Sequence, residues 1–174
     1  MKHLLLVTII CFYTISLLAQ EQEKSLETFV AEKQSELIYD ASKLVTAPNT
    51  NVQLIPPEHF IADPDINGFS HPGSGTTIQI LEIPNLGHRS IEQGMTPEYI
   101  ENQGYEFIEK VELTTETGKR AVIYFVKFET NVHEFERAML FTGEDKTIWV
   151  NVNYPSSMKK LLYPAIEATL KSVQ

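Results

Sequence analysis

The chain has 174 residues and a formal net charge of −9 at pH 7, with 23 acidic residues against 14 lysines and arginines. A chain of this length is typical of one ordinary domain. The acidic balance, with no basic cluster to offset it, argues against nucleic acids and anionic lipids as partners, because both need compensating lysines and arginines.

Residues 1–20 have the three-part layout of a secretory signal peptide. Lys2 gives a short basic start, residues 4–18 are almost uninterruptedly apolar, and Ala19 and Gln20 precede a charged stretch. The apolar run is short for a membrane span, which takes about 20 residues. We therefore expect cleavage after Ala19 or Gln20. A buried N-terminal helix and an uncleaved anchor are the alternatives.

The single cysteine, Cys11, lies in the middle of this apolar run. A lipoprotein needs its cysteine at the cleavage point, so we do not expect a lipoprotein. After cleavage the chain has no cysteine, which excludes disulfides, thiolate metal sites and a cysteine nucleophile. The expected mature protein is exported to the periplasm or the extracellular space, and it is soluble, without a membrane span.

Residues 21–49 are expected to form a helical lead-in, and residues 50–174 a single domain. Apolar residues recur at roughly helical spacing over 22–45, without glycine or proline. The stretch 47–51, which contains proline and asparagine, is typical of a connection.

From Val52 onward the apolar period changes to that of strands. Residues 52–55 predict a short strand that ends at Pro56, since proline cannot donate a ladder hydrogen bond. Residues 62–75 predict a polar loop. Residues 76–83 alternate cleanly and carry apolar residues on both faces, which predicts a strand covered on both sides.

The second half of the chain predicts a helical region followed by a meander. Thr96 and Pro97 are a favourable helix start inside the helical region 88–104, and Gly104 stands where a helix would stop. Residues 105–154 contain four alternating segments separated by turns, the pattern of a four-strand meander.

A final helix is expected over residues 157–172, whose apolar residues share one side. The sum predicts an α+β fold, a central antiparallel sheet with helices packed on it. If Trp149 and Tyr124 were exposed on one face, they would mark a partner surface. We expect most aromatic residues of the meander to be buried instead: Tyr124, Phe125, Phe128, Phe135, Phe141, Trp149 and Tyr154.

Several of these features follow one another in a recognisable order. A strand runs into a proline-aromatic corner, a Gly-Phe pair and an isoleucine-rich strand in VQLIPPEHFIADPDINGFSHPGSGTTIQILEIP, residues 52–84. A helix ending at Gly104, an aliphatic strand ending in Tyr154-Pro155, and a C-terminal helix come later. In this order, over residues 50–174, the chain resembles the PsbP-like superfamily.

The resemblance implies an α/β/α sandwich around the antiparallel sheet. Known members are mostly non-enzymatic: extrinsic subunits of photosynthetic complexes, a nuclear protein that binds a small GTPase, and bacterial envelope proteins or chaperones. The fold does not choose between these roles, because function belongs to sites rather than to scaffolds.

One motif suggests a metal site. Asp63, Asp65, Asn67 and Gly68 occupy the first, third, fifth and sixth positions of a calcium loop of the EF-hand type. The bidentate glutamate that ends such a loop is replaced by Ser74. Asp, Asn and Gly are also turn formers. The sequence therefore favours a turn between strands, with Asp63, Asp65 and Asn67 as the candidate cation ligands.

Other catalytic patterns are incomplete. There is no G-x-S-x-G elbow, and Glu134 and Glu136 are expected on the solvated outer face of a strand. The histidines of the mature chain lack the i, i+4 spacing of a helical zinc site, and we expect them to be exposed or half-exposed: His59, His71, His88 and His133.

Two functions follow from these observations. The first is a non-enzymatic binding or assembly module of the bacterial cell envelope, without a cofactor, whose partner is another envelope protein. The alternative is a metal-dependent or hydrolytic enzyme whose site forms only in three dimensions, from Asp63, Asp65, His71 or the strand glutamates. A pocket with convergent polar groups favours the enzyme, and a broad apolar or aromatic patch favours the module.

Overall fold

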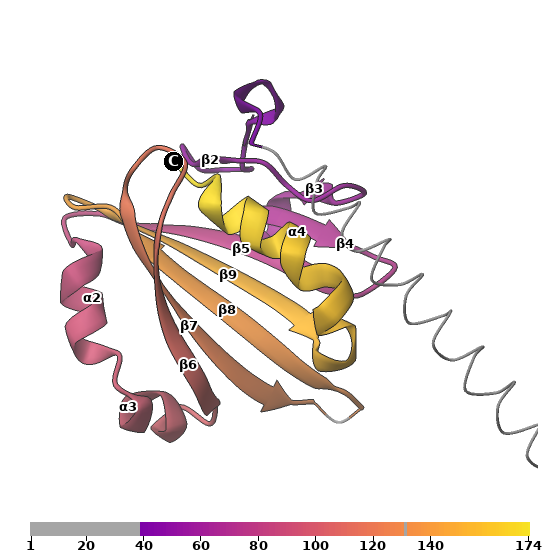
Figure 1. The fold of residues 1–174 in the computed structure, drawn as a ribbon, viewed down its shortest axis with the longest axis vertical. Coiled ribbons are helices and arrows are strands. Elements are labelled where there is room, and N and C mark those ends of the chain that lie inside the picture. Colours follow the sequence, from indigo (N-terminus) through magenta and orange to yellow (C-terminus); the bar gives the residue numbers. More distant parts are fainter. Residues whose placement is uncertain (1–38, 131) are drawn as a thin grey trace, which may run out of the picture. The chain divides into compact units, whose positions relative to one another are not determined.

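The structure, a computed structural model, describes residues 39–130 and 132–174. The predicted signal peptide and the lead-in up to residue 38 lie outside this part of the chain. The compact unit runs from Tyr39 to Gln174. It is built on a seven-stranded antiparallel sheet with helices packed against it (Figure 1), which confirms the predicted α+β fold.

The large sheet is the main element of the described chain. Its strands are β3 (Ile61–Asp63), β4 (Gly68–His71), β5 (Thr76–Ile83), β6 (Glu106–Thr114), β7 (Arg120–Glu129), β8 (Glu134–Thr142) and β9 (Thr147–Pro155). The spatial order is β3-β4-β5-β9-β8-β7-β6, and every neighbouring pair is antiparallel. The four strands β6 to β9 form the predicted meander. The last of them, β9, lies in the middle of the sheet beside β5.

A second, two-stranded sheet precedes the large one in the chain. It pairs β1 (Val45–Thr46) with β2 (Gln53–Leu54). Gln53 also exchanges two backbone hydrogen bonds with Gln174, at 3.1 and 3.0 Å, so the C-terminal residue is joined to β2. Ala47, between the two strands, is buried in the main core. Residues 45–49 therefore belong to the same packed unit as the large sheet.

The helix expected over residues 22–45 is not present in its described part. From residue 39 the chain forms only a single 3-10 turn, η1 (Ala41–Lys43), before it enters β1. The Asp40 side chain caps this turn by accepting hydrogen bonds from the backbone N–H and the hydroxyl of Ser42. Such local side-chain bonds compete with a continuing helix.

The helical region predicted over residues 88–104 consists of two short helices, α2 (His88–Gly94) and α3 (Pro97–Asn102). Thr96 separates them, because its hydroxyl oxygen accepts a hydrogen bond from the Tyr99 backbone N–H at 3.1 Å and begins α3. Gly104 follows α3 with a φ of 85°, a conformation that favours glycine.

One face of the sheet is covered by α4 (Lys159–Lys171), which follows the 3-10 turn η3 (Ser156–Met158) (Figure 1). Ile166 and Leu170 of α4 pack on inward-facing residues of the central strands, and Tyr154 is fully buried there. The apolar cluster on this face includes Ile78, Ile80, Ile123, Phe125, Leu140, Val150 and Val152.

The opposite face is covered by α2 and α3, but only in part. Ile100 of α3, with Ile91 and Met95 beside it, packs on a cluster drawn mainly from β7 and β8: Val122, Tyr124, Val126, Met139 and Phe141. On the β5 side of this face the side chains of Gln79 and Leu81 are only half-buried. The expectation that β5 is covered on both sides is therefore wrong for its second face.

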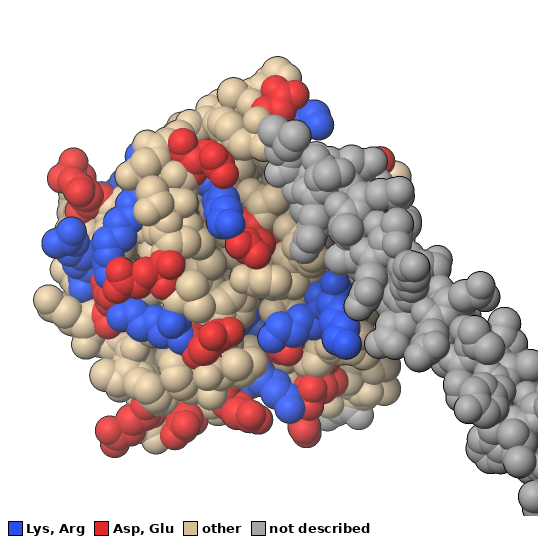
Figure 2. Space-filling model, in the orientation of Figure 1, with Lys and Arg blue, Asp and Glu red and all other residues tan. Residues whose placement is uncertain are grey.

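The surface over α4 mixes both signs of charge. Figure 2 shows acidic and basic side chains interspersed over this face, and several of them form ion pairs, including Lys159 with Glu136 and Lys171 with Glu167. Within residues 39–130 and 132–174, no helix is long and apolar enough to cross a membrane.

Candidate functional site

The candidate cation ligands lie in the hairpin between β3 and β4. The side chain of Asp63 accepts a hydrogen bond from the Asp65 backbone N–H at 3.3 Å and begins the 3-10 turn η2 (Pro64–Ile66). Asn67 ends that turn in the left-handed conformation, with a φ of 52°, and its side-chain oxygen accepts from Asn49 at 3.0 Å. The Asp63 oxygen thus closes the turn, and the Asn67 oxygen joins it to Asn49, in the connection between β1 and β2.

Gly68 has a packing role immediately after this turn. It pairs with Gln79 of β5, and a Cβ atom at this position would collide with the backbone carbonyl of Ile78. Glycine is required because the two strands approach each other so closely.

His71, the other residue of the proposed three-dimensional metal site, lies at the far end of β4. Its ring stacks on Phe60 with 5.4 Å between ring centroids, and Nδ1 lies 2.8 Å from the Ser74 hydroxyl. The structure therefore separates His71 from Asp63 and Asp65. Among the described residues, no group of three or more histidine, cysteine or acidic side chains converges as metal ligands would.

His88 is buried, against the expectation that all four histidines would be at least half-exposed. Its Nδ1 lies 2.7 Å from the Gly143 carbonyl oxygen, and its Nε2 lies 3.2 Å from an Arg120 guanidinium nitrogen. A carbonyl can only accept, so Nδ1 donates, and Nε2 then accepts from Arg120. The pattern is typical of a core histidine that holds the start of α2.

Arg120 is the centre of a charged network between α2 and the sheet. Its guanidinium donates two hydrogen bonds to Glu92 of α2, at 2.8 and 3.0 Å, and two to Glu112 of β6, at 2.8 and 3.3 Å. Lys110 donates to Glu92 at 2.7 Å. Arg120, and then Lys110, lower the pKa of Glu92 to about 2. Every charge in this network has a partner, so the network docks α2 on the sheet.

A second network ties the start of α4 to the sheet. Glu136 is buried on the α4 face, where it accepts from the Tyr154 hydroxyl at 3.1 Å and pairs with Lys159 at 2.7 Å. Burial and the negative charge of Glu136 raise the pKa of Tyr154. Glu134 and Glu136 do share a face, as predicted, but Glu136 is not solvated, because α4 covers it. Glu134 pairs with Lys127 at 2.6 Å.

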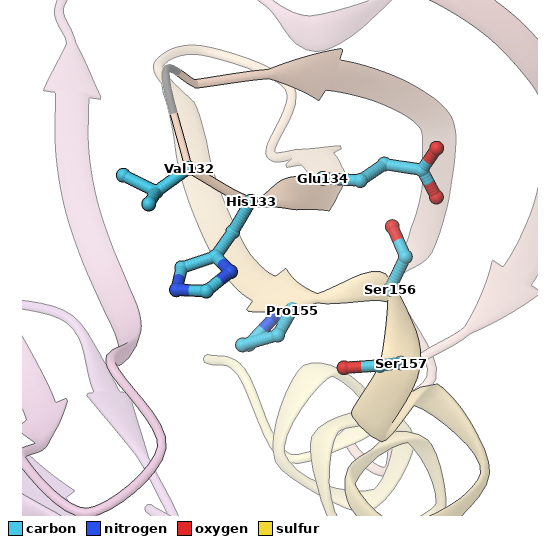
Figure 3. A pocket seen from close by; sticks show the side chains of 6 residues that line it. All are labelled: Val132, His133, Glu134, Pro155, Ser156 and Ser157. Carbon is cyan, nitrogen blue, oxygen red and sulfur yellow. The ribbon is translucent and has the colours of Figure 1, made fainter.

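An open depression of about 520 Å³ lies where the β7–β8 connection meets the end of β9 (Figure 3). His133, Glu134, Ser156 and Ser157 line it, together with Val132 and Pro155. The His133 ring lies apart from the carboxylate of Glu134 (Figure 3). No hydrogen bond joins His133 to either serine in the described part of the chain. A nucleophile and its base need such a contact, and the described residues of this depression do not provide one.

The face that α2 and α3 leave partly uncovered carries a largely polar set of side chains, of which only Trp149 was named as a candidate from the sequence. We call this set the open strip. It runs across β5, β9 and β8, and consists of Thr77, Gln79, Leu81, Arg137, Trp149, Asn151 and Asn153, with Tyr105 at its end. The strand register places these side chains on one side of the sheet.

Arg137 is the charged residue of the open strip, and its surroundings hold it in one orientation. Its Nε donates to the Asn153 side-chain oxygen at 2.6 Å, and a terminal nitrogen donates to the Tyr105 hydroxyl at 2.7 Å. Its guanidinium carbon lies 5.1 Å from the ring centroids of both Tyr105 and Phe128. Asn153 in turn donates to the Thr77 hydroxyl at 3.0 Å.

The half-buried cation of Arg137 has no carboxylate partner within residues 39–130 and 132–174. All its hydrogen-bond partners are neutral oxygens, and the remaining N–H groups of the guanidinium, including both on the second terminal nitrogen, make no hydrogen bond there. Two buried polar atoms of the same strip also lack a hydrogen-bond partner among the described residues: Asn151 Oδ1 and Trp149 Nε1. Polar atoms buried in this way are normally hydrogen-bonded, so the open strip is the candidate binding site.

A signal for this site was present in the sequence. Phe135, Arg137, Met139 and Phe141 alternate along one strand and therefore share a face, so Arg137 is a charge among apolar neighbours. A single charge on an otherwise apolar face is a reason to look for its partner.

Comparison with known proteins gives structural neighbours. No protein-family model and no curated protein matches the chain. Among solved structures, the chain is similar to LpqN, which is involved in cell envelope biogenesis of Mycobacterium tuberculosis. The TM-score is 0.56 and the sequence identity 13%, over 71% of this chain and 82% of LpqN. At this identity the likeness shows a related fold.

Two further structures give lower scores. A protein of unknown function from Pseudomonas aeruginosa has a TM-score of 0.41 and 12% identity, over 55% of this chain and 81% of that one. A protein from Bacteroides thetaiotaomicron has a TM-score of 0.48 and 15% identity, over 76% of this chain and 47% of that one.

Proposed function

We propose that the protein is an exported, non-enzymatic binding module of the bacterial cell envelope, which holds a second envelope protein on the open strip. The observation that carries the proposal is Arg137, a half-buried cation that neutral partners hold in a fixed orientation and that no carboxylate of the described chain neutralises. An oriented, uncompensated charge is suited to recognition, because little side-chain freedom is lost on binding.

Three further observations support the proposal. Residues 1–20 have the layout of a secretory signal peptide. The order of motifs over residues 50–174 resembles the PsbP-like superfamily, whose known members are mostly non-enzymatic. LpqN, which has a related fold, takes part in cell envelope biogenesis. We therefore assign the chain to the PsbP-like superfamily as part of this proposal, with residues 21–174 as the mature protein.

Export can be tested separately from binding. We expect the full chain, expressed in a bacterial host, to appear in the periplasmic or extracellular fraction with a mature N-terminus at Gln20 or Glu21, as read by mass spectrometry. A chain that keeps Met1 and stays in the cytoplasmic fraction would contradict the exported function.

The binding surface can be tested by site-specific photo-crosslinking in the cell envelope. A photo-reactive phenylalanine in place of Gln79, inside the open strip, should give a discrete adduct with an envelope protein. The matched control is Leu161 on α4, which is 51% exposed on the opposite face. Adducts of equal yield from both positions, or none from Gln79, would argue against this surface.

A further inference from the structure

We infer that the open strip binds the free C-terminal carboxylate of a peptide segment, and that Arg137 is the group that holds it. The inference rests on the proposed function, since it names the chemical feature by which the partner is recognised. It takes the partner to be a protein or peptide with an accessible C-terminus.

A comparison of the two half-buried arginines of the sheet, Arg120 and Arg137, indicates that Arg137 binds an anion. Arg120 has the ordinary environment of such a residue, with Glu92 and Glu112 both hydrogen-bonded to its guanidinium. Arg137 has two neutral oxygens instead, from Asn153 and Tyr105. In a chain with a formal net charge of −9, acidic side chains are plentiful, yet none of those described pairs with Arg137.

The geometry around Arg137 favours a carboxylate. Its guanidinium plane is fixed by two aromatic rings and two hydrogen bonds, which leaves N–H groups at one edge for a ligand. A guanidinium edge matches the two oxygens of a carboxylate, and such charge-assisted pairs are stronger than hydrogen bonds between neutral groups.

The unpartnered atoms beside Arg137 distinguish a peptide from a simple anion. Asn151 Oδ1 needs a donor and Trp149 Nε1 needs an acceptor, and a peptide group offers both an N–H and a C=O. The two residues are two positions apart on β9, about 7 Å along the strand, and Asn151 is diagonal to Arg137 across the β8–β9 pair. An extended peptide that ends at Arg137 therefore passes both atoms.

Access to these two atoms requires a local rearrangement. Asn151 is 5% exposed between Gln79 of β5 and Met139 of β8. Trp149 lies between Leu81 of β5 and Phe141 of β8, on which its ring stacks. Both Gln79 and Leu81 are half-buried side chains at the surface of the strip. A peptide reaches Asn151 and Trp149 when these two side chains turn aside.

The competing explanation is that Arg137 only fixes Tyr105, at the start of β6, to the sheet. The substitution N153D separates the two roles. Asn153 already accepts from Arg137 at 2.6 Å, and aspartate has nearly the same shape, so the variant places an internal carboxylate in the same space. The Thr77 hydroxyl, which accepts from the Asn153 amide, can donate to the aspartate instead. A purely structural arginine is retained or strengthened by this change, whereas a ligand carboxylate is repelled and displaced.

The experiment uses Trp149, the single tryptophan of the chain, as a fluorescent reporter inside the strip. The mature protein is titrated with N-acetyl-trialanine that has a free C-terminal carboxylate, with the same peptide as its C-terminal amide, and with inorganic phosphate. We expect saturable binding of the carboxylate peptide, with the amide and phosphate weaker by ~10-fold or more, a difference that corresponds to the loss of one charge-assisted contact.

Two variants complete the test. N153D and R137K should both weaken binding of the carboxylate peptide by ~10-fold or more, and N153D should melt at or above the temperature of the wild-type chain. Equal binding of acid and amide, equal binding of phosphate, no saturable binding, or wild-type affinity in N153D would each overturn the inference. If position 79 still cross-links to an envelope protein in the N153D variant, the result supports the proposed binding module but not its recognition of a carboxylate.

Discussion

Asp63 shows how a single side chain can close a hairpin. It accepts the backbone N–H of Asp65 and begins η2, whereas Asp65 is exposed and only its backbone takes part. We expect D63A to lower the melting temperature by about 2–4 °C, because loss of such a cap costs about 1 kcal/mol. D65A should leave the melting temperature unchanged.

The same melts test the loop for metal. Calcium, zinc and EDTA should leave the melting temperatures of the wild-type, D63A and D65A chains unchanged. A metal that binds only the folded state would raise the melting temperature with its concentration. A rise of several degrees in calcium that D65A abolishes would restore the cation site.

Whether the role of a residue could be predicted from the sequence depends on how many positions separate it from its contact partners. The Asp63 side chain and the left-handed backbone of Asn67 act within the 63–68 turn, so the local pattern was enough to predict that turn. Arg137 depends on Asn153 and Tyr105, which are 16 and 32 positions away. The alternation around Arg137 marks a charge among apolar neighbours, but no local pattern specifies which residues it contacts. The rest of the open strip became visible only when the strands were placed side by side.

At the scale of elements, the Glu92–Arg120 pair holds α2 on the sheet. The pKa of Glu92 is about 2 in the folded protein, below its usual value of 4.5, because Arg120 and Lys110 stabilise the carboxylate. This stabilisation is fully present above pH 4.5 and is lost as the pH falls towards 2. We expect E92Q to be less stable at neutral pH and to lose less stability on acidification.

Urea denaturation at a series of pH values measures this effect. The matched control is E101Q, at an acidic residue of α3 that is exposed and forms no ion pair in the described part of the chain. Parallel curves of unfolding free energy against pH for E92Q and wild type would show that the pair does not couple α2 to the sheet.

The elements that could be predicted are those with a strong period. Strand β5 was predicted with its observed bounds, and β6 to β9 as four strands within residues 105–154, because their apolar residues alternate or run on over eight to ten positions. Weak periods were less informative. The short strands β3 and β4 were predicted as part of a loop, and η1 and β1 replaced the end of the predicted lead-in helix.

At the scale of the whole molecule, the described core runs from Ala47 to Val173, and Gln174 is joined to β2. This core contains members from both ends of the compact unit. We expect a chain of residues 39–174 to unfold cooperatively, at the same temperature as residues 21–174, when the two are compared by circular dichroism. A melting temperature lower by several degrees in the shorter chain would show that residues 21–38 contribute to stability.

The position of β9 has a consequence for the order in which the protein can fold. Although β9 is the last strand to be synthesised, it is the strand that joins β3, β4 and β5 to the meander. Before Thr147 is added, β3, β4 and β5 can pair only with one another, and so can β6, β7 and β8. The core that α4 covers draws residues from both groups of strands and from β9. This core therefore cannot close until the last two elements of the chain, β9 and α4, have left the ribosome.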